Sequence, residues 1–367
     1  MRTVVPKSPV RGMVFMKSKR KYEIDNLRNI TILFLFPVHT FMIWNDFGSS
    51  FYIWQGGNRV LSTLIVLINP WFMPFLFVLA GISARYALQK RTNKQFIAER
   101  IKKLLVPFVF GLVVLVPFQT LYARKFFSGY DGGLLKNWGY FFTHFTDLSG
   151  YDGAFTPGHL WFILFLFLIS LIALAVFRLA PYEKFSERIG KAPVLAVLLL
   201  FVPIWLMYYV GNFGGYSLGK DFMLYLAGYY VLSNDKIVET LEKNIKWLAG
   251  LFVIGTLASV VLYYKFSYYG DLWVTFIGWI SILVFLVAGK RFFSRKTRFT
   301  EYFNRASYPI YILHQSILVV SAYYLVRASD MLPVQVLSIC IGSFLLTVLA
   351  YQLIKWIPVV RKGIGVK

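Results

Sequence analysis

The stretch 160–177, which reads LWFILFLFLISLIALAVF, decides the fold class. It carries no charged residue and is about as long as a helix that crosses the hydrocarbon core of a bilayer. Similar apolar runs recur along the 367-residue chain, and charged residues lie almost only between them. Runs of this length are typical of membrane helices and differ from the short alternating segments of an outer-membrane barrel. The sequence therefore predicts an all-α polytopic membrane protein.

The overall composition excludes other classes of protein. Hydrophobic residues make up 58% of the chain and charged residues only 15%, with a mean hydropathy of +0.61. A soluble domain of this size needs a far more charged surface, and a disordered chain is much less apolar. A single cysteine, Cys340, rules out a disulfide framework and a cysteine-based metal site.

The apolar runs predict about ten transmembrane helices. We place them at about 29–46, 60–84, 104–122, 159–178, 193–210, 221–232, 246–264, 271–289, 306–326 and 334–356. With this count, 32 of the 39 Lys and Arg residues fall on one side of the membrane and 7 on the other. Positive charge marks the cytoplasmic side, so both termini are predicted to be cytoplasmic. The domains are then a basic tail over 1–28, a membrane domain over 29–356 and a short basic tail over 357–367.

The net charge of +23 lies on the predicted cytoplasmic side. Orientation in the membrane and attraction to anionic lipid headgroups account for most of it. We therefore expect membrane lipids, and not nucleic acid, as partners of this basic surface.

The first predicted span contains ionisable residues, and its stretch 25–39 reads DNLRNITILFLFPVH. Arg28 and His39 lie about three helical turns apart, so they share one face, and Asp25 joins them three positions before Arg28. The rise of about 16 Å puts Arg28 at the inner surface and His39 near mid-membrane. An ionisable residue at that depth costs roughly 2.5–3.5 kcal/mol, which favours a functional role. Pro37 is expected to free a carbonyl or bend the helix beside His39.

Two further histidines lie in other spans. His314, followed by Gln315, is predicted at a depth comparable to that of His39, and we expect this pair to support the site by hydrogen bonding. His159 begins the fourth span at the predicted outer surface, where an acceptor molecule would enter. Two histidines without a nearby carboxylate make a poor metal site, so no metal is expected.

Arg100, Lys102 and Lys103 lie together just before the third span, at the predicted inner surface. The preference of positive charge for the cytoplasmic side is one explanation of this cluster. Binding of a polyanion such as the phosphates of coenzyme A is the other.

Several motifs make the chain resemble the acyltransferase-3 family of integral membrane acyltransferases over about 22–356. The family's hallmark is an Arg, ten intervening residues and a His in the first span, which Arg28 and His39 fit. Other matching stretches are 69–81 (NPWFMPFLFVLAG), 100–107 (RIKKLLVP), 159–162 (HLWF) and 308–315 (YPIYILHQ). The last two are most similar to the branch of glucan-succinylating proteins of periplasmic glucan biosynthesis.

The resemblance implies transfer of an acetyl or succinyl group from cytosolic acyl-CoA to a hydroxyl of an extracytoplasmic glycan or glycolipid, in the cell membrane. His39 would act as general base or as a transient acyl carrier. The CoA phosphates would be held by Arg28, Arg100, Lys102 and Lys103. The supporting residues would be Asp25, His159, Trp161, His314 and Gln315. The chain could also form an oligomer with further copies of itself.

The chain departs from the family pattern at two places. Lys103 stands where the family often has a second Arg, which keeps the charge and loses the bidentate fork. No hydrolase-like domain follows the tenth span in this sequence, so we expect the acceptor to meet the membrane domain or a separate partner.

A second class of function also fits the buried histidine and the proline-interrupted spans. A proton-coupled transporter or flippase would use the same features without covalent chemistry. Against it, the sequence shows neither repeated halves nor a carboxylate near mid-membrane.

Overall fold

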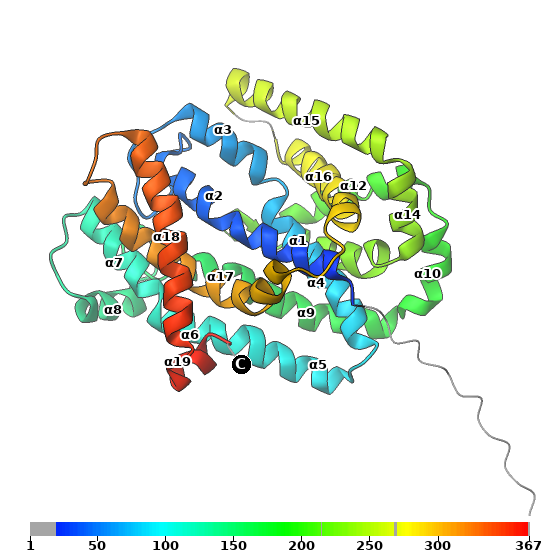
Figure 1. The fold of residues 1–367 in the computed structure, drawn as a ribbon, viewed down its shortest axis with the longest axis horizontal. Helices are drawn as coiled ribbons and strands as arrows, with labels where there is room; N and C mark the ends of the chain where they lie inside the picture. Colours follow the sequence, from blue (N-terminus) through cyan, green and yellow to red (C-terminus); the bar gives the residue numbers. More distant parts are fainter. Residues whose placement is uncertain (1–19, 214, 268–269, 366–367) are drawn as a thin grey trace, which may run out of the picture.

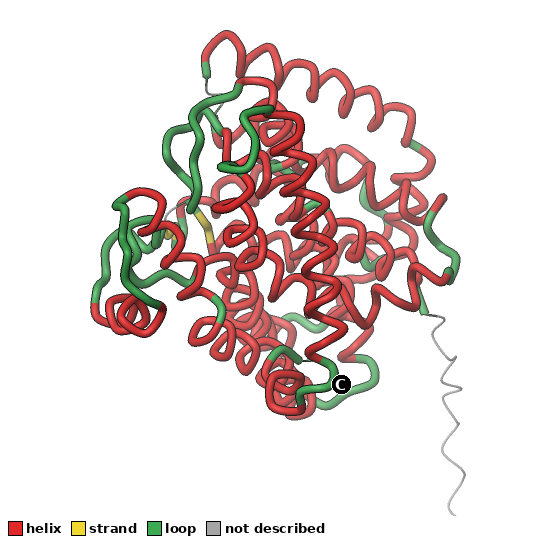
Figure 2. The backbone as a smooth tube through the Cα atoms, turned by 60° about the vertical axis from the view of Figure 1, so that its left-hand side comes forward, coloured by secondary structure: helices red, strands yellow, loops and turns green. Residues whose placement is uncertain are grey.

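The computed structural model describes residues 20–213, 215–267 and 270–365, and nearly all of them lie in helices or short connections (Figures 1 and 2). The first half contains α1 (Tyr22–Leu33), α2 (Leu35–Phe41), η1 (Met42–Trp44), α3 (Arg59–Ile68), α4 (Phe72–Leu88), α5 (Asn93–Arg100), η2 (Ile101–Leu105), α6 (Val106–Val114), α7 (Val116–Phe127), α8 (Leu134–Thr143), η3 (Gly158–Leu160), α9 (Trp161–Leu179) and α10 (Tyr182–Gly190). The second half contains α11 (Val194–Leu198), α12 (Phe201–Leu206), η4 (Met207–Tyr209), α13 (Leu218–Ala227), η5 (Gly228–Leu232), α14 (Asp235–Lys243), α15 (Ile245–Phe266), α16 (Asp271–Phe292), α17 (Arg298–Leu325), α18 (Leu332–Ile354) and α19 (Pro358–Gly363). Two short strands, β1 (Asn212–Phe213) and β2 (Tyr216–Ser217), pair antiparallel.

Seven helical segments of the described chain are long and apolar enough to cross a membrane. They are Tyr22–Trp44, Arg59–Leu88, Asn93–Phe127, Gly158–Leu179, Ile245–Phe266, Asp271–Phe292 and Leu332–Ile354. Each coincides with one of the predicted spans, so the prediction of an all-α chain with several membrane helices is confirmed.

The other three predicted spans are also helical, but they are shorter or more polar. The apolar segment Val194–Tyr209 is short, and α13 with η5 covers only 218–232. Helix α17 is long, but His314 and Gln315 lie in its middle. The count of ten and the cytoplasmic termini stay predictions.

The predicted terminal tails lie partly outside the described residues, which begin at 20 and end at 365. Within the described part, α1 already begins at Tyr22, and α19 forms a short helix close to α6. The predicted boundary at 28 falls inside α1, and the one at 357 lies in the connection between α18 and α19.

Helices α1, α2, α4 and α17 form the centre of the bundle (Figure 1). Helix α1 packs on α4, α16 and α17, and α2 packs on α17 and α18. At the periphery, only 17% of the apolar window of α15 and 22% of that of α18 is buried, against 72% for Arg59–Leu88. Because the exposed residues of α15 and α18 are apolar, these two helices present their outer faces to lipid.

Helix α4 contacts α13 and η5 directly through their backbones. A Cβ built at Gly81 would lie 2.0 Å from the Tyr225 carbonyl oxygen, and one built at Gly228 would lie 2.2 Å from the Val78 carbonyl oxygen. Small residues allow this close approach, which is the usual way in which membrane helices gain packing energy. The contact fixes the position of α4 against its neighbours.

The predicted effect of Pro37 is present in the first span. The helix is interrupted at Phe34, between α1 and α2. Pro37 has no N–H to donate to the Leu33 carbonyl one turn before it, which explains an interruption at this point.

We expect Gly81→Ala to lower the free energy of unfolding by about 1–3 kcal/mol, because the added methyl group meets backbone that cannot move aside. The measurement is thermal unfolding of the purified protein in lipid nanodiscs. Gly250→Ala is the matched control, since nothing lies within 4 Å of its Cβ position and alanine favours a helix. Equal unfolding temperatures for both variants would contradict the close backbone contact.

Candidate functional site

Three histidines from different parts of the chain meet inside the bundle. The ring of His39 on α2 stacks on that of His314 on α17 with centroids 5.3 Å apart, and the His159 ring lies 5.1 Å from His314, edge to face. The prediction that His39 and His314 lie at one depth is therefore confirmed. His159 differs from the prediction, because it is 6% exposed and lies in this cluster instead of at the surface.

Both ring nitrogens of His159 are used in hydrogen bonds. Its Nε2 lies 2.9 Å from the Ile312 carbonyl oxygen, which can only accept, so Nε2 carries the proton. The Gln119 amide nitrogen, at 3.1 Å, then donates to Nδ1 and also donates to the Ser316 hydroxyl. These bonds hold His159 as a neutral ring without a free lone pair.

His314 is held in the opposite tautomer. Its Nδ1 lies 2.6 Å from the Tyr311 carbonyl oxygen and therefore donates to it. The Nε2 of the neutral ring then carries a lone pair, and it is buried without a partner among the described residues. The neighbouring Gln315 Oε1 is likewise buried and unpartnered in the described chain. A buried polar atom of this kind costs about 1–3 kcal/mol unless a water or ligand meets it.

His39 is the accessible member of the cluster. It makes no hydrogen bond within the described residues, and its Nδ1 is a buried atom without a partner there. Its side chain is partly exposed, whereas His314 is fully buried. Phe51, from the connection between η1 and α3, stacks against the other face of the His39 ring at 5.8 Å. Of the three histidines, only His39 has neither ring nitrogen in a hydrogen bond with a described residue.

The cluster is not arranged as a metal site. The described residues contain no group of three or more His, Cys, Asp or Glu side chains that could hold a metal ion. The His39 and His314 rings are stacked, so their nitrogens do not converge on one point, and both nitrogens of His159 are already bonded.

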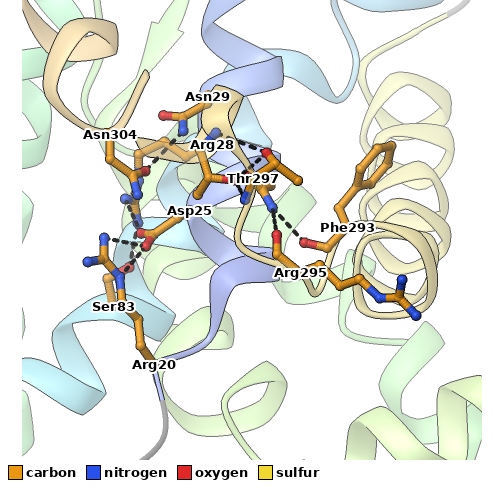
Figure 3. A network of polar contacts seen from close by, with 11 residues as sticks. Arg20, Asp25, Arg28, Asn29, Ser83, Phe293, Arg295, Thr297 and Asn304 are labelled. Atoms are coloured by element: carbon orange, nitrogen blue, oxygen red, sulfur yellow. Dashed lines mark hydrogen bonds and ion pairs between the residues drawn. The ribbon is translucent and has the colours of Figure 1, made fainter. Parts of the chain in front are cut away.

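Arg28 lies at the other end of the first span, within a polar network (Figure 3). Its Nη1 is 3.3 Å from Asp25 Oδ1, which is the contact that the spacing predicted. Its Nη2 donates to the Ser83 hydroxyl on α4 at 2.7 Å, and Arg20 pairs with Asp25 from the other side. The guanidinium therefore has a fixed position.

The start of α1 is tied to α17 by amides and hydroxyls (Figure 3). Asn29 donates to the Asn304 side chain at 3.0 Å, and the Thr300 hydroxyl donates to Asn26 at 2.6 Å. Thr300 and Thr297 also form the capping box that begins α17. These bonds tie the start of α1 to the start of α17. His39 lies further along the first span, on α2, and His314 further along α17, so the bonds set the depth of one histidine relative to the other.

The predicted cation cluster 100–103 divides into two parts. Arg100 ends α5 with its Nε buried and unpartnered in the described chain, and it lies near enough to Arg28 for their charges to interact. Lys102 and Lys103 lie in η2, a π-helical turn, and are exposed, with Lys103 3.7 Å from Glu99. Of the four residues expected to hold the CoA phosphates, Arg28 and Arg100 are thus partly buried, whereas Lys102 and Lys103 lie at the surface.

The π-helical turn joins two of the quoted motifs. Pro107 has no N–H for the Lys103 carbonyl one turn before it, and the Tyr308 hydroxyl donates to that carbonyl instead. Stretches 100–107 and 308–315 are therefore in direct contact. π-helical turns of this kind occur often at functional sites.

Several residues of the site were not predicted from the sequence. Gln119 is fully buried and orients His159, and Phe51 covers His39. Tyr225 is fully buried on α13, where its carbonyl oxygen lies against Gly81 of α4. Trp161, which was predicted, stacks on Tyr216 at 4.2 Å. Gln119 had a signal in the sequence, as a polar residue inside an apolar span, whereas Phe51 had none.

Fold and site together define a multi-pass membrane protein with a buried histidine cluster and an arginine pair near one surface. The family model described as an acyltransferase domain matches residues 21–352, and the chain belongs to this family, acyltransferase-3. It is therefore a membrane acyltransferase. Neither a curated protein nor a solved structure matches the chain.

We expect Tyr308→Phe to lower the free energy of unfolding by about 0.5–1.5 kcal/mol, because the Lys103 carbonyl, which Pro107 leaves without a backbone donor, then loses this hydrogen bond. The measurement is again thermal unfolding in nanodiscs. Tyr324→Phe removes a hydroxyl from an exposed pair with Tyr122 and should change stability by less than about 0.5 kcal/mol. A Tyr308→Phe protein as stable as the control would contradict this role of the hydroxyl.

Proposed function

We propose that this acyltransferase moves an acetyl or succinyl group from cytosolic acyl-CoA to a hydroxyl of an extracytoplasmic glycan or glycolipid. The observation that carries the proposal is that His39, a half-buried histidine in the bundle, has no hydrogen-bond partner among the described residues. Arg28, on the same span, is held by Asp25 and Ser83, and Arg100 supplies a second cation toward the predicted cytoplasmic side. This pair suits the phosphates of CoA.

The chemistry at His39 follows one of two routes. In direct transfer, the acceptor hydroxyl attacks the thioester carbonyl, so that a C–O bond forms and the C–S bond breaks. His39 takes the hydroxyl proton as general base and passes it to the CoA thiolate. In two-step transfer, a His39 nitrogen attacks first and CoA leaves, and the hydroxyl then attacks the acyl-imidazole. Both routes need a neutral ring, which burial among apolar side chains favours.

Residues around the two arginines and around His39 support donor binding and catalysis in this proposal. Asp25 orients Arg28, while Lys102 and Lys103, exposed in η2, attract the donor to the inner surface. His314 stacks on His39 and His159 supports His314 by ring contact, while Gln315 follows His314 with its Oε1 free among the described residues. Trp161 and Tyr216 form a stacked aromatic pair suited to a sugar face on the predicted outer side.

The proposal also names the acyl donor, the acceptor, the membrane and the oligomeric state. The similarity of 159–162 and 308–315 to the glucan-succinylating branch favours a glucan acceptor and a succinyl donor. The charge distribution favours the cell membrane, with ten spans and cytoplasmic termini. Oligomers are compatible with the apolar outer faces of α15 and α18.

We expect His39→Ala to abolish acyl transfer while CoA still binds, because the variant loses the reactive ring and keeps the arginines. The assay follows CoA release and radiolabelled product from acetyl-CoA and succinyl-CoA, with the protein in nanodiscs and a glucan acceptor present. His144→Ala, in an exposed loop, is the control and should retain activity. Acyl transfer by His39→Ala would contradict the catalytic role, and CoA-independent movement of a glycan across vesicles would favour the transporter or flippase.

We expect Arg28→Gln to weaken binding of CoA about 10- to 100-fold, because a charge-assisted hydrogen bond contributes about 1.5–3 kcal/mol. Binding is measured by calorimetry in nanodiscs. Lys296→Gln, which removes an exposed cation paired with Glu301, is the control. If both variants bind CoA as the unmodified protein does, the anchor is not at Arg28.

A further inference from the structure

A cavity lies beside α10, away from the histidine cluster. It has a volume of about 600 Å³ and lies between α10 and Tyr230 of η5. Phe185 and Ile189 of α10 and the ring of Tyr230 line it, with an alanine at either end of the helix. The Tyr230 hydroxyl donates to the Ala180 carbonyl, so the tyrosine presents its ring and not its polar end to the cavity. The floor of the cavity is therefore apolar.

The cavity lies where the inner leaflet of the membrane is expected. Helix α10 follows α9 at the side that the charge distribution predicts to be cytoplasmic. Large apolar side chains next to it are exposed, with Leu179 at 86%, Leu195 at 61% and Leu199 at 50%. A short helix with one apolar and one charged face, flanked by exposed leucines, is typical of a segment that lies in the membrane interface.

Two cations lie at the rim of this apolar floor. Arg188 lines the cavity and makes no ion pair or hydrogen bond with its side chain within the described residues. Lys191 also lines it and pairs with Glu187 at 2.8 Å, but both side chains are more than two-thirds exposed. Exposed ion pairs of this kind contribute little to stability, so Lys191 remains available to another anion.

We propose that this cavity binds one anionic glycerophospholipid of the inner leaflet. The phosphate meets Arg188 and Lys191, and the first carbons of the acyl chains lie against Phe185, Ile189 and Tyr230. An apolar floor beside two cations matches the boundary between the acyl chains and the phosphate of such a lipid. A soluble phosphate would use the cations and leave the floor unused.

Another cavity of comparable size among the described residues provides an internal comparison. It has about 510 Å³ and is lined by Val260, Val261, Tyr264 and Lys265 near the end of α15. It offers an apolar floor with a single cation, on the predicted outer side. We expect a lipid to occupy it without preference for a negative charge.

The test is native mass spectrometry of the purified full chain with phosphatidylglycerol and phosphatidylcholine of identical acyl chains. We expect one phosphatidylglycerol to be retained more tightly than phosphatidylcholine. Arg188→Gln and Lys191→Gln should each weaken that binding about fivefold, in line with roughly 1 kcal/mol per surface cation. Glu187→Gln should strengthen it, because this change frees Lys191 and removes a like charge.

Controls separate this site from general attraction to a basic surface. Lys243→Gln removes an exposed cation of α14 on the same predicted side and should leave retention unchanged. Glycerol phosphate should not displace the lipid. Equal retention of both lipids, equal binding by Arg188→Gln and Lys243→Gln, or displacement by glycerol phosphate would each overturn the proposal.

Discussion

Inside a bilayer no water replaces a missing hydrogen-bond donor, so every carbonyl that a proline leaves free needs another partner. At Pro107 and Pro117 the side chain of another helix supplies that donor. The Tyr308 hydroxyl donates to Lys103 in place of Pro107, and the Trp138 indole donates to the Val113 carbonyl in place of Pro117. The first bond joins the π-helical turn beside Arg100 to α17, and the second joins α6 to α8.

The sequence predicted the fold class and the depth of the reactive residues, because both depend on local regularities. Apolar runs define helices, and the rise per residue places His39 and His314 at one depth whichever helices surround them. The α1–α2 interruption was also predictable, since Pro37 acts on its own helix. Two predicted spans, α13 with η5 and α17, do not stand out as long apolar helices, because α13 with η5 is short and α17 carries His314 and Gln315 in its middle.

The arrangement of the site depended on contacts between distant segments. The short turn η3 carries His159 inward onto His314, and no local pattern indicates its burial. Lys102 and Lys103 follow Arg100 closely in sequence, yet a single π-helical turn leaves them at the surface. Phe51 comes from a connection with no pattern at all, and only the folded chain places it over His39.

The glycine contacts between α4 and the α13–η5 segment have a mechanical consequence. Two backbones in direct contact cannot slide past each other without a clash, so this part of the bundle moves as one body. Arg28 is bonded to Ser83 on the same body and moves with it. Any displacement of His39 relative to Arg28 during turnover is therefore a bend at Phe34, where the first span is interrupted, and the distance from anchor to reactive ring is set by that one joint.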